Sequence, residues 1–229
     1  MAGRSSPMVN SDDVLADRVD YQVGGLADDE VAPEPLSQFQ AWLRDAARGG
    51  VPEANAMSLA TCGDSGPQVR AVLAKSVDRT GVTFYTNRES AKAAEIAHDP
   101  RVALLFLWLP LHRQVRFTGV AEPVGRDEAG EYFATRPREA QLGAWASPQS
   151  RPLTGREELV DRVAAVRERF ADGEVPLPDH WGGYRVRIET VEFWQGQPSR
   201  LHDRVVFRGL HTPAMLDTPA DWQRSRLAP

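Results

Sequence analysis

The chain has little cysteine and no excess of positive charge, and each shortage removes a class of protein. Cys62 is the single cysteine among 229 residues, so an intramolecular disulfide framework is excluded. The sequence has no C-x-x-C pattern, and a structural zinc site is therefore not expected. Cys62 ends a predicted strand, where we expect a small buried hydrophobe. A net charge of −5 argues against a general nucleic-acid surface.

Apolar runs are also too short for a membrane-spanning helix. The longest, residues 102–110, has the length of a strand, whereas a helix that crosses a bilayer needs ~20 apolar residues. The N-terminus lacks the apolar segment of a secretory signal. These absences predict a soluble cytoplasmic protein that binds neither membrane nor nucleic acid. The apolar fraction of 41% is enough for one core.

Short strands separated by turn residues dominate the rest of the chain. Residues 1–34 show no sustained periodicity and are expected to form a flexible arm, followed by a single domain at 35–229. Strands are predicted at residues 56–62, 68–75, 82–86, 101–109, 113–124 and 184–194. Helices are predicted from Pro35 to the Gly49-Gly50 stop, at 91–98, at 127–146 with a break at Pro137, and after Thr154. A G-x-G-x-x-G fingerprint is absent, which disfavours a Rossmann domain. The pattern predicts a mainly β (α+β) fold, an antiparallel barrel with peripheral helices.

The last predicted helix carries two signals. Thr154 and Glu157 have the spacing of a capping box. The apolar residues that follow recur at helical spacing and are expected to pack on the core: Leu159, Val163, Val166 and Phe170.

Arg200, His202 and Arg204 alternate just after the aromatic-rich segment 192–196. Alternate side chains of an extended strand share a face, so two cations and an imidazole would lie beside Trp194. This group suits a flat, anionic, heteroaromatic ligand. A half-buried strand with a charged solvent face fits the same pattern.

Other residues could form anion sites. Thr86, Ser90 and Lys92 surround a predicted helix start, which favours a phosphate monoester, although capping by Ser90 explains part of the pattern. Tyr132 and Arg136 share a helical face and could hold a second phosphate or form a surface stacking pair.

Further polar residues leave the same choice open. Arg70 and Lys75 would point to opposite faces of one strand, toward two ligands or toward solvent. Gln141, Gln149 and Ser150 could form hydrogen bonds to the carbonyl and nitrogen atoms of a ring, or could be ordinary polar loop residues. Together these groups imply a phosphorylated cofactor and a phosphorylated substrate, and the residues alone lead no further.

Seven ordered blocks of the sequence carry a more specific signal: 70–75; 84–87 with Ser90 and Lys92; 113–115; 132–133 with 136–138; 141–147 with 149–150; 176–178 with 181–183; and 192–196 with 200–204. The chain also ends in Arg-Leu-Ala-Pro. With these blocks it resembles the pyridoxine (pyridoxamine) 5′-phosphate oxidase family of flavin enzymes, from about Tyr21 to Pro229.

The resemblance implies a split-barrel FMN-binding fold that works as a homodimer, with FMN at the subunit interface. Arg70, Lys92 and Ser90 would hold the FMN phosphate. The remaining flavin contacts, some of them from the partner chain, would come from Ala71, Val72, Leu73, Lys75, Tyr85, Thr86, Gln114, Gln149, Ser150, Trp194 and Arg204.

The resemblance also implies a substrate site. Lys75, Tyr132 and Arg136 would grip the phosphate of pyridoxine 5′-phosphate or pyridoxamine 5′-phosphate. The catalytic residues would be Arg200, which orients the substrate, and His202, the candidate proton acceptor, with Leu201 between them. Arg18 and Tyr21 would belong to an arm that folds over the substrate. The expected product is pyridoxal 5′-phosphate, with dioxygen reduced to hydrogen peroxide.

Two positions depart from the family pattern. Ala91 stands where many members have an arginine, and Ala140 where a serine often assists the substrate phosphate, so weaker affinity is expected. Arg88 is near enough in sequence to replace the missing cation. Three rival functions remain: a phenazine-pathway flavin oxidase, a deazaflavin-dependent reductase and a non-catalytic flavin or pyridoxal phosphate carrier. Lys75, Arg18 and Tyr21 argue against the first, and residues 200–204 against the second.

Overall fold

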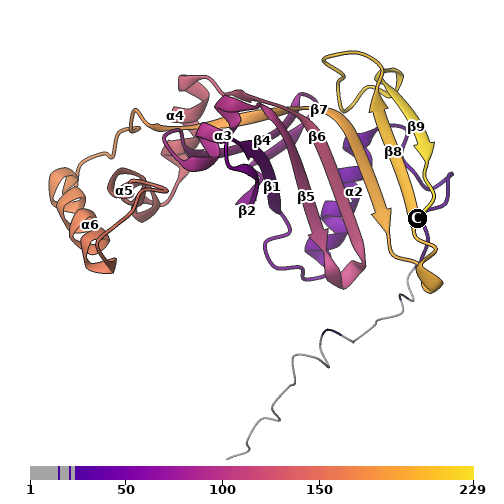
Figure 1. The fold of residues 1–229 in the computed structure, drawn as a ribbon, viewed down its shortest axis with the longest axis horizontal. Helices are drawn as coiled ribbons and strands as arrows, with labels where there is room; N and C mark the ends of the chain where they lie inside the picture. Colours follow the sequence, from indigo (N-terminus) through magenta and orange to yellow (C-terminus); the bar gives the residue numbers. More distant parts are fainter. Residues whose placement is uncertain (1–14, 16–20, 22–23) are drawn as a thin grey trace, which may run out of the picture.

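The computed structural model describes Leu15, Tyr21 and residues 24–229. In this part of the chain, nine strands form one sheet whose strands pair antiparallel. Helices flank this sheet, and the helices at residues 138–146 and 156–170 extend away from one of its ends (Figure 1). The strand order is β2-β1-β5-β6-β7-β4-β3, with β8 paired to β7 and β9 to β8. The predicted mainly β fold with peripheral helices is confirmed.

The strands are β1 (Ala56–Gly63), β2 (Gly66–Leu73), β3 (Ser76–Asp78), β4 (Gly81–Asn87), β5 (Arg101–Trp108), β6 (Arg113–Pro123), β7 (Trp181–Gln195), β8 (Asp203–Gly209) and β9 (Trp222–Arg226). The helices are α2 (Pro35–Arg48), α3 (Ala91–His98), α4 (Arg126–Thr135), α5 (Arg138–Ala146) and α6 (Arg156–Phe170), and a 3-10 turn at Pro198–Arg200 precedes β8.

Strand β7 splits the barrel. One of its edges pairs with β6 over almost its whole length, while the other edge pairs first with β4 and then with β8. In Figure 1, β7 runs from the end of the molecule that holds α5 and α6 to the end that holds β8 and β9. A bulge at Thr118/Gly119 bends β6 against β7, where a Cβ on Gly119 would lie 1.9 Å from the Arg187 carbonyl oxygen. One strand therefore reaches both regions in which site residues gather.

The main core lies between α2 and the sheet. Glu34 caps α2 by accepting a hydrogen bond from the Ser37 N–H at 2.9 Å, as expected for a helix that starts at Pro35. The Phe39 ring lies 4.9 Å from that of Phe106 and 5.3 Å from that of Phe117. Each such ring, once fully buried, stabilises the fold by about 1.5–3 kcal/mol.

A smaller core holds the helical lobe together. Ala129 and Phe133 of α4 and Leu142 of α5 pack with Val175 and Trp181. Because Trp181 begins β7, this core fixes α4 and α5 next to the end of the sheet. The predicted helix at 127–146 is thus two helices, divided beside Pro137 as expected.

Two expectations for α6 are wrong. The Thr154 N–H and hydroxyl donate to Glu158 at 2.8 and 2.9 Å, one residue beyond the predicted partner Glu157, because Gly155 rather than Thr154 directly precedes the helix. No α6 residue is buried. Val166 and Phe170 pack only at the edge of the smaller core, so the apolar stripe stays partly exposed.

The free thiol of Cys62 is exposed, contrary to expectation. Its neighbours Thr61 and Leu59 face the core, and in an alternating strand the side chain of Cys62 therefore points outward. None of the described helices is long and apolar enough to cross a membrane, and the cytoplasmic location stays a prediction.

Part of the expected N-terminal arm packs on the domain. Leu26 and Val31 are buried in the main core, and the Leu26 N–H donates to the Asp203 carboxylate at 3.0 Å. Residues 24–34 are thus in contact with the domain predicted to begin at residue 35. The rest of that arm, Arg18 included and Leu15 and Tyr21 excepted, lies outside the described residues.

Candidate active site

A cavity of about 690 Å³ lies beside the end of β2 and β4, between α3 and the α4–α5 pair. Ligand sites commonly measure about 300–1,000 Å³, so a cofactor-sized molecule fits. Its walls contain these predicted site residues: Ala71, Val72, Leu73, Lys75, Tyr85, Thr86, Lys92, Tyr132, Arg136 and Gln149. The structure therefore gathers segments far apart in sequence around one space.

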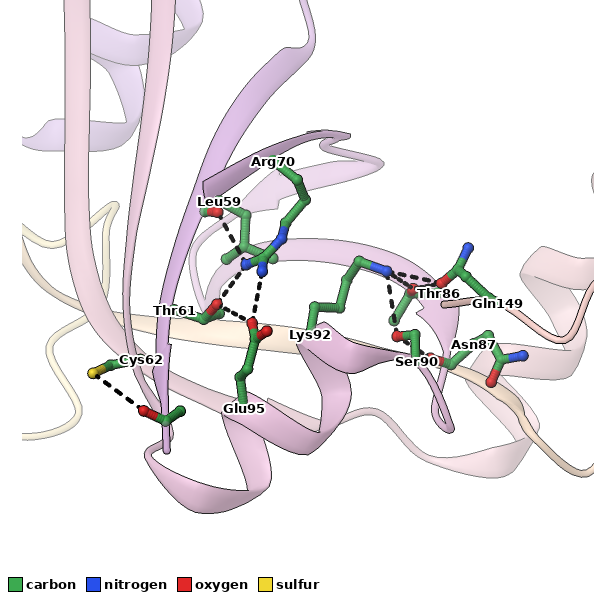
Figure 2. A network of polar contacts seen from close by, with 11 residues as sticks. Leu59, Thr61, Cys62, Arg70, Thr86, Asn87, Ser90, Lys92, Glu95 and Gln149 are labelled. Carbon is green, nitrogen blue, oxygen red and sulfur yellow. Dashed lines mark hydrogen bonds and ion pairs between the residues drawn. The ribbon is translucent and has the colours of Figure 1, made fainter. Parts of the chain in front are cut away.

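Lys92 marks one cationic part of the cavity (Figure 2). Its Nζ donates to Gln149 Oε1 at 2.8 Å and to the Thr86 hydroxyl at 3.2 Å. Burial, followed by the positive charge of Arg70, lowers the pKa of Lys92 below 10.5. An anion placed here would offset both effects.

Ser90 is fully buried where α3 begins. Its hydroxyl donates to the Asn87 carbonyl at 2.7 Å instead of capping the helix. Among the described residues no side chain caps this end, so capping does not explain the hydroxyl that the sequence placed here.

Arg70 is near Lys92 but is not among the residues that line the cavity. Its Nη2 donates to Glu95 at 2.6 Å, while Nη1 donates to Thr61 and to the Leu59 carbonyl (Figure 2). The prediction that Arg70 and Lys75 lie on one strand is wrong, because β2 ends at Leu73. Lys75 follows the strand and faces the cavity.

An aromatic wall forms the second cationic part. Tyr85 stacks on Tyr132 with ring centroids 4.0 Å apart, and Trp181 lies parallel at 5.5 Å from Tyr85. The Arg136 guanidinium lies 4.9 Å from the Trp181 ring, and Lys75 Nζ 6.0 Å from that of Tyr132.

One nitrogen of the Arg136 guanidinium lacks a hydrogen-bond partner within the described chain. Its Nη1 is buried and makes no hydrogen bond to any residue that the structure describes. Burial lowers the pKa of the guanidinium, although it stays charged. A buried donor without a partner costs about 1–3 kcal/mol or more, so this atom is positioned for a ligand oxygen.

A second group lies elsewhere: the predicted residues Tyr21, Trp194 and His202 gather with His112, which was not predicted, and we call these four residues the C-terminal cluster. The Tyr21 ring lies 4.1 Å from that of His112 and 5.8 Å from that of His202, which is 4.5 Å from Trp194. The Gln197 N–H donates to His202 Nδ1 at 3.0 Å. In a neutral ring the proton is then on Nε2, which argues against His202 as a proton acceptor at that atom.

Arg200, His202 and Arg204 do not share a strand face, and this prediction is wrong. Pro198 starts a 3-10 turn, Arg200 has a φ of 62°, and β8 begins only at Asp203. Arg200 and Leu201 are exposed, with Leu201 at 71%. Arg204 alone lies on the strand, where its Nε donates to Glu192 at 2.7 Å.

One face of the sheet connects the cavity with the C-terminal cluster. Directly paired residues place their side chains on the same face, and this relation runs from Ala71 through Ser58, Leu105, Arg116 and Glu192. Gln114 is two residues from Arg116 along β6, and Trp194 is two residues from Glu192 along β7, so both lie on this face. Gln114 pairs with Trp194, and Trp194 pairs with Arg204. Ala71 of β2, Gln114 of β6, Trp194 of β7 and Arg204 of β8 thus share one surface, whereas Arg70 and Val72 of β2 belong to the opposite face.

The remaining residues singled out in the sequence differ in whether they lie at the cavity. Gln141 donates to the Phe133 carbonyl at 3.0 Å, a contact within the helical lobe, and Ser150 is exposed beside Gln149. Ala140 lines the cavity, whereas Ala91 is exposed at the first position of α3. Arg88 is not among the lining residues.

Three further residues lie near the sites. Trp181 belongs to one of the seven sequence blocks, whereas Glu95 and His112 are not among the predicted site residues. Glu95 lies three residues after Lys92, a spacing that places both on one helical face and could have indicated their proximity. His112 meets Tyr21 through tertiary contacts that no local pattern shows.

Comparison with known proteins decides the family. A sequence model described as pyridoxamine 5′-phosphate oxidase matches residues 43–170. A second, the pyridoxine 5′-phosphate oxidase C-terminal dimerisation region, matches residues 181–229. The chain belongs to the pyridoxine/pyridoxamine 5′-phosphate oxidase family. It is an oxidoreductase, and its C-terminal part is the family's dimerisation region.

Relatives extend this match over almost the whole chain. A pyridoxine/pyridoxamine 5′-phosphate oxidase of Kineococcus radiotolerans is 51% identical over 222 residues, which cover 95% of this chain and 100% of that protein. One of Cupriavidus necator is 49% identical over 217 residues, covering 94% and 99%.

Solved structures confirm the fold. PhzG from Burkholderia lata, in complex with tetrahydrophenazine-1-carboxylic acid, superposes with a TM-score of 0.81 at 27% identity and covers 91% of this chain and 100% of that one. A pyridoxamine 5′-phosphate oxidase-related, FMN-binding protein of Nostoc punctiforme has a TM-score of 0.65 at 15% identity and covers 87% and 100%. The second likeness supports the split-barrel fold alone.

Proposed function

We propose that the protein oxidises pyridoxine 5′-phosphate or pyridoxamine 5′-phosphate to pyridoxal 5′-phosphate with FMN, reducing dioxygen to hydrogen peroxide. The observation that carries the proposal is a single cavity with two separate cationic groups. One group is Lys92 with its hydroxyl and amide neighbours, and the other is Lys75 and Arg136 on the aromatic wall. Two phosphorylated molecules, a cofactor and a substrate, would use both.

The residues present fit FMN. Lys92, Thr86 and Ser90 at the start of α3 would hold its phosphate, since Lys92 is partly desolvated and converges with Thr86 on one oxygen, that of Gln149. Residues 71–73, Lys75 and Tyr85 would line the flavin ring. When bound, FMN accepts a hydride from the substrate and passes the electrons to dioxygen.

The second group fits the substrate phosphate. The orphaned Nη1 of Arg136 would donate to a phosphate oxygen, and Lys75 and the Tyr132 hydroxyl would complete the set. The Arg136 guanidinium also lies over the Trp181 ring, 4.9 Å from its centroid, a cation–π contact that would help to hold it in place before the ligand arrives. These residues bind and orient the substrate, and most of the rate enhancement would follow from that orientation.

The C-terminal cluster would complete the cavity of a second copy of the chain. It shares the sheet face described above with the β2 wall, and that face carries the exposed apolar residues Val69 (69%) and Leu107 (47%). Packed on a copy of itself about a twofold axis, this face buries its apolar residues and brings cluster and cavity together. Gln114, Trp194 and Arg204 would then reach flavin from the partner, with Ser150 near the same edge.

Arg200 and His202 would act on the substrate from that side. Arg200 is exposed within the described chain and would orient the substrate ring and offset developing negative charge. His202, with Nδ1 engaged by the Gln197 N–H, would donate from Nε2 to a substrate oxygen. Tyr21 packs on His202 and would close the site from above.

One specific observation supports a second candidate, a phenazine-type oxidase. The structural likeness to PhzG, which holds a tetrahydrophenazine carboxylic acid, covers 91% of the chain. The Lys75–Arg136 group favours the phosphorylated substrate, because a desolvated guanidinium and an ammonium together suit a phosphate dianion.

An aerobic assay of FMN-loaded protein tests the proposal. With pyridoxine 5′-phosphate we expect flavin bleaching under low oxygen, and equal yields of pyridoxal 5′-phosphate and hydrogen peroxide in air. Turnover of a dihydrophenazine carboxylate without either B6 substrate would favour the second candidate. Bound flavin with no turnover of any of them would indicate a carrier.

A further inference from the structure

One carboxylate belongs to the cation group at the start of α3 and has no role in the function proposed above. Glu95 Oε2 accepts from Arg70 Nη2 at 2.6 Å and from the Thr61 hydroxyl at 2.5 Å (Figure 2). The side chains of Glu95 and Arg70 are only 13% and 22% exposed. An acid so near Lys92 should repel a phosphate, and its presence there needs a reason.

The contacts of Glu95 fix the position of Arg70. In the described chain β2 pairs with β1 alone, and a long arginine side chain on such an edge strand has many rotamers. Nη1 is held by Thr61 and by the Leu59 carbonyl of β1, and Nη2 by Glu95 of α3. The guanidinium is thereby tied to the helix that carries Lys92.

Glu95 also balances the charge of the two cations. Burial is the first cause of the lowered pKa of Lys92 and the charge of Arg70 the second, while the charge of Glu95 acts in the opposite direction. Without the carboxylate, Arg70 and Lys92 would repel each other across a partly desolvated space. Arg70 would then be free to swing into solvent.

We propose that Glu95 is the positioning residue of this end of the cavity: it holds Arg70 beside Lys92 so that both cations act on the FMN phosphate. The inference rests on the proposed function, because it takes the bound anion to be that of FMN. It assigns Glu95 an indirect role, through Arg70, with no contact to the cofactor.

The direction in which one substitution changes FMN affinity separates a positioning role of Glu95 from a purely electrostatic one. Glu95→Gln keeps the shape and removes the negative charge, so a Coulomb effect alone would tighten FMN binding. If Glu95 positions Arg70, binding weakens by roughly 10- to 100-fold, the loss expected for one charge-assisted hydrogen bond to a phosphate. Titration of the unliganded protein by flavin fluorescence, with FMN and with riboflavin, measures this.

Riboflavin and two variants supply the controls. Riboflavin lacks the phosphate, so its affinity should not change in Glu95→Gln. Asp99→Asn removes the same charge just after α3, from a pair with the 79% exposed Arg101, and should leave FMN affinity unchanged or slightly tighter. Thr61→Val loosens the same clamp and should weaken FMN binding in the same direction by a smaller factor, which also decides the matter if Glu95→Gln does not fold.

Each outcome has one meaning. Equal or tighter FMN binding by Glu95→Gln, in a protein that prefers FMN to riboflavin, overturns the role of Glu95 and leaves the proposed function standing. Equal losses for FMN and riboflavin indicate a general structural role and also overturn it. A wild-type protein that does not prefer FMN refutes the cofactor assignment, and the inference fails with it.

Discussion

The cavity and the C-terminal cluster both contain predicted site residues, but those of the cavity are held by contacts within the chain and those beside the cluster are exposed. Cavity residues come from β2, β4, α3, α4 and α5 of one chain and are held by contacts within it, as Lys92 is by Gln149 and Thr86. The C-terminal cluster lies on an open sheet face, and beside it Arg200 and Leu201 are exposed.

The difference indicates which half of the site a single chain can complete. Binding of anions needs desolvated cations, and the cavity already has them in Lys92 and Arg136. The cluster has two aromatic side chains, Tyr21 and Trp194, and two imidazoles, and none of its residues lines that cavity. Beside the cluster, the backbone of Arg200 has a left-handed φ of 62°, a conformation that is unfavourable for a residue other than glycine.

Mixing two inactive variants tests most directly whether the cavity of one chain and the C-terminal cluster of another form one active site. Arg136→Met should disable the cavity and Arg200→Met the cluster, each leaving little activity as a homodimer. If cluster and cavity of different chains meet, exchange of subunits forms heterodimers with one intact site, and roughly a quarter of wild-type activity returns. Activity is measured before and after subunit exchange, with each variant alone as control. No recovery, despite proven heterodimers, would place the two regions in the same chain's site.

Loss of Arg136 alone should be the next largest effect. Arg136→Met removes the orphaned donor, so kcat/KM for pyridoxine 5′-phosphate should fall by roughly 10- to 100-fold. The melting temperature should not fall, because removing the buried, unbonded Nη1 offsets the lost contact with the Trp181 ring. Arg169→Met is the matched control: its guanidinium stacks 4.8 Å from the Trp145 ring outside the cavity, and kcat/KM should stay unchanged. A lower melting temperature with normal kcat/KM would make Arg136 a structural residue.

The pH dependence of FMN binding sharpens the account of Lys92. Its pKa is lowered, so the ammonium is lost at a lower pH than for an ordinary lysine, and FMN affinity should fall as pH rises through that pKa. In unliganded protein the sign is opposite: the unfolded chain holds this proton more tightly, so stability rises with pH between the lowered pKa and 10.5.

Fluorescence titration of FMN from about pH 7 to about pH 10 measures the first effect, a range in which the phosphate stays a dianion. Lys92→Met should bind FMN more weakly and without this pH dependence. A pH profile unchanged by the substitution would assign the titration to another group.

Local patterns predicted the parts of the site that local geometry determines. Hairpin signals gave β1, β2, β5 and β6, and the start of α3 followed from residues 90–100. The exposed thiol of Cys62 and the turn at Arg200 were missed, since each depends on which face the finished sheet buries or on a backbone turn after Pro198. The pairing of Arg70 with Glu95 also needed the fold, because 25 residues separate them.

The smallest predicted effect concerns a departure visible in the sequence. Ala91 is exposed at the first position of α3, beside Lys92, and Arg88 does not line the cavity in its place. Ala91→Arg should therefore tighten FMN binding by only about two- to fivefold, since an exposed charge is screened and contributes about 1 kcal/mol or less. The gain should shrink as salt is added. Ala94→Arg, also exposed on α3 but one turn farther from the helix start, is the control and should tighten binding less. Equal gains from both variants would indicate a general attraction for anions, whereas a gain at position 91 alone would place the FMN phosphate at the start of α3 and not at the C-terminal cluster.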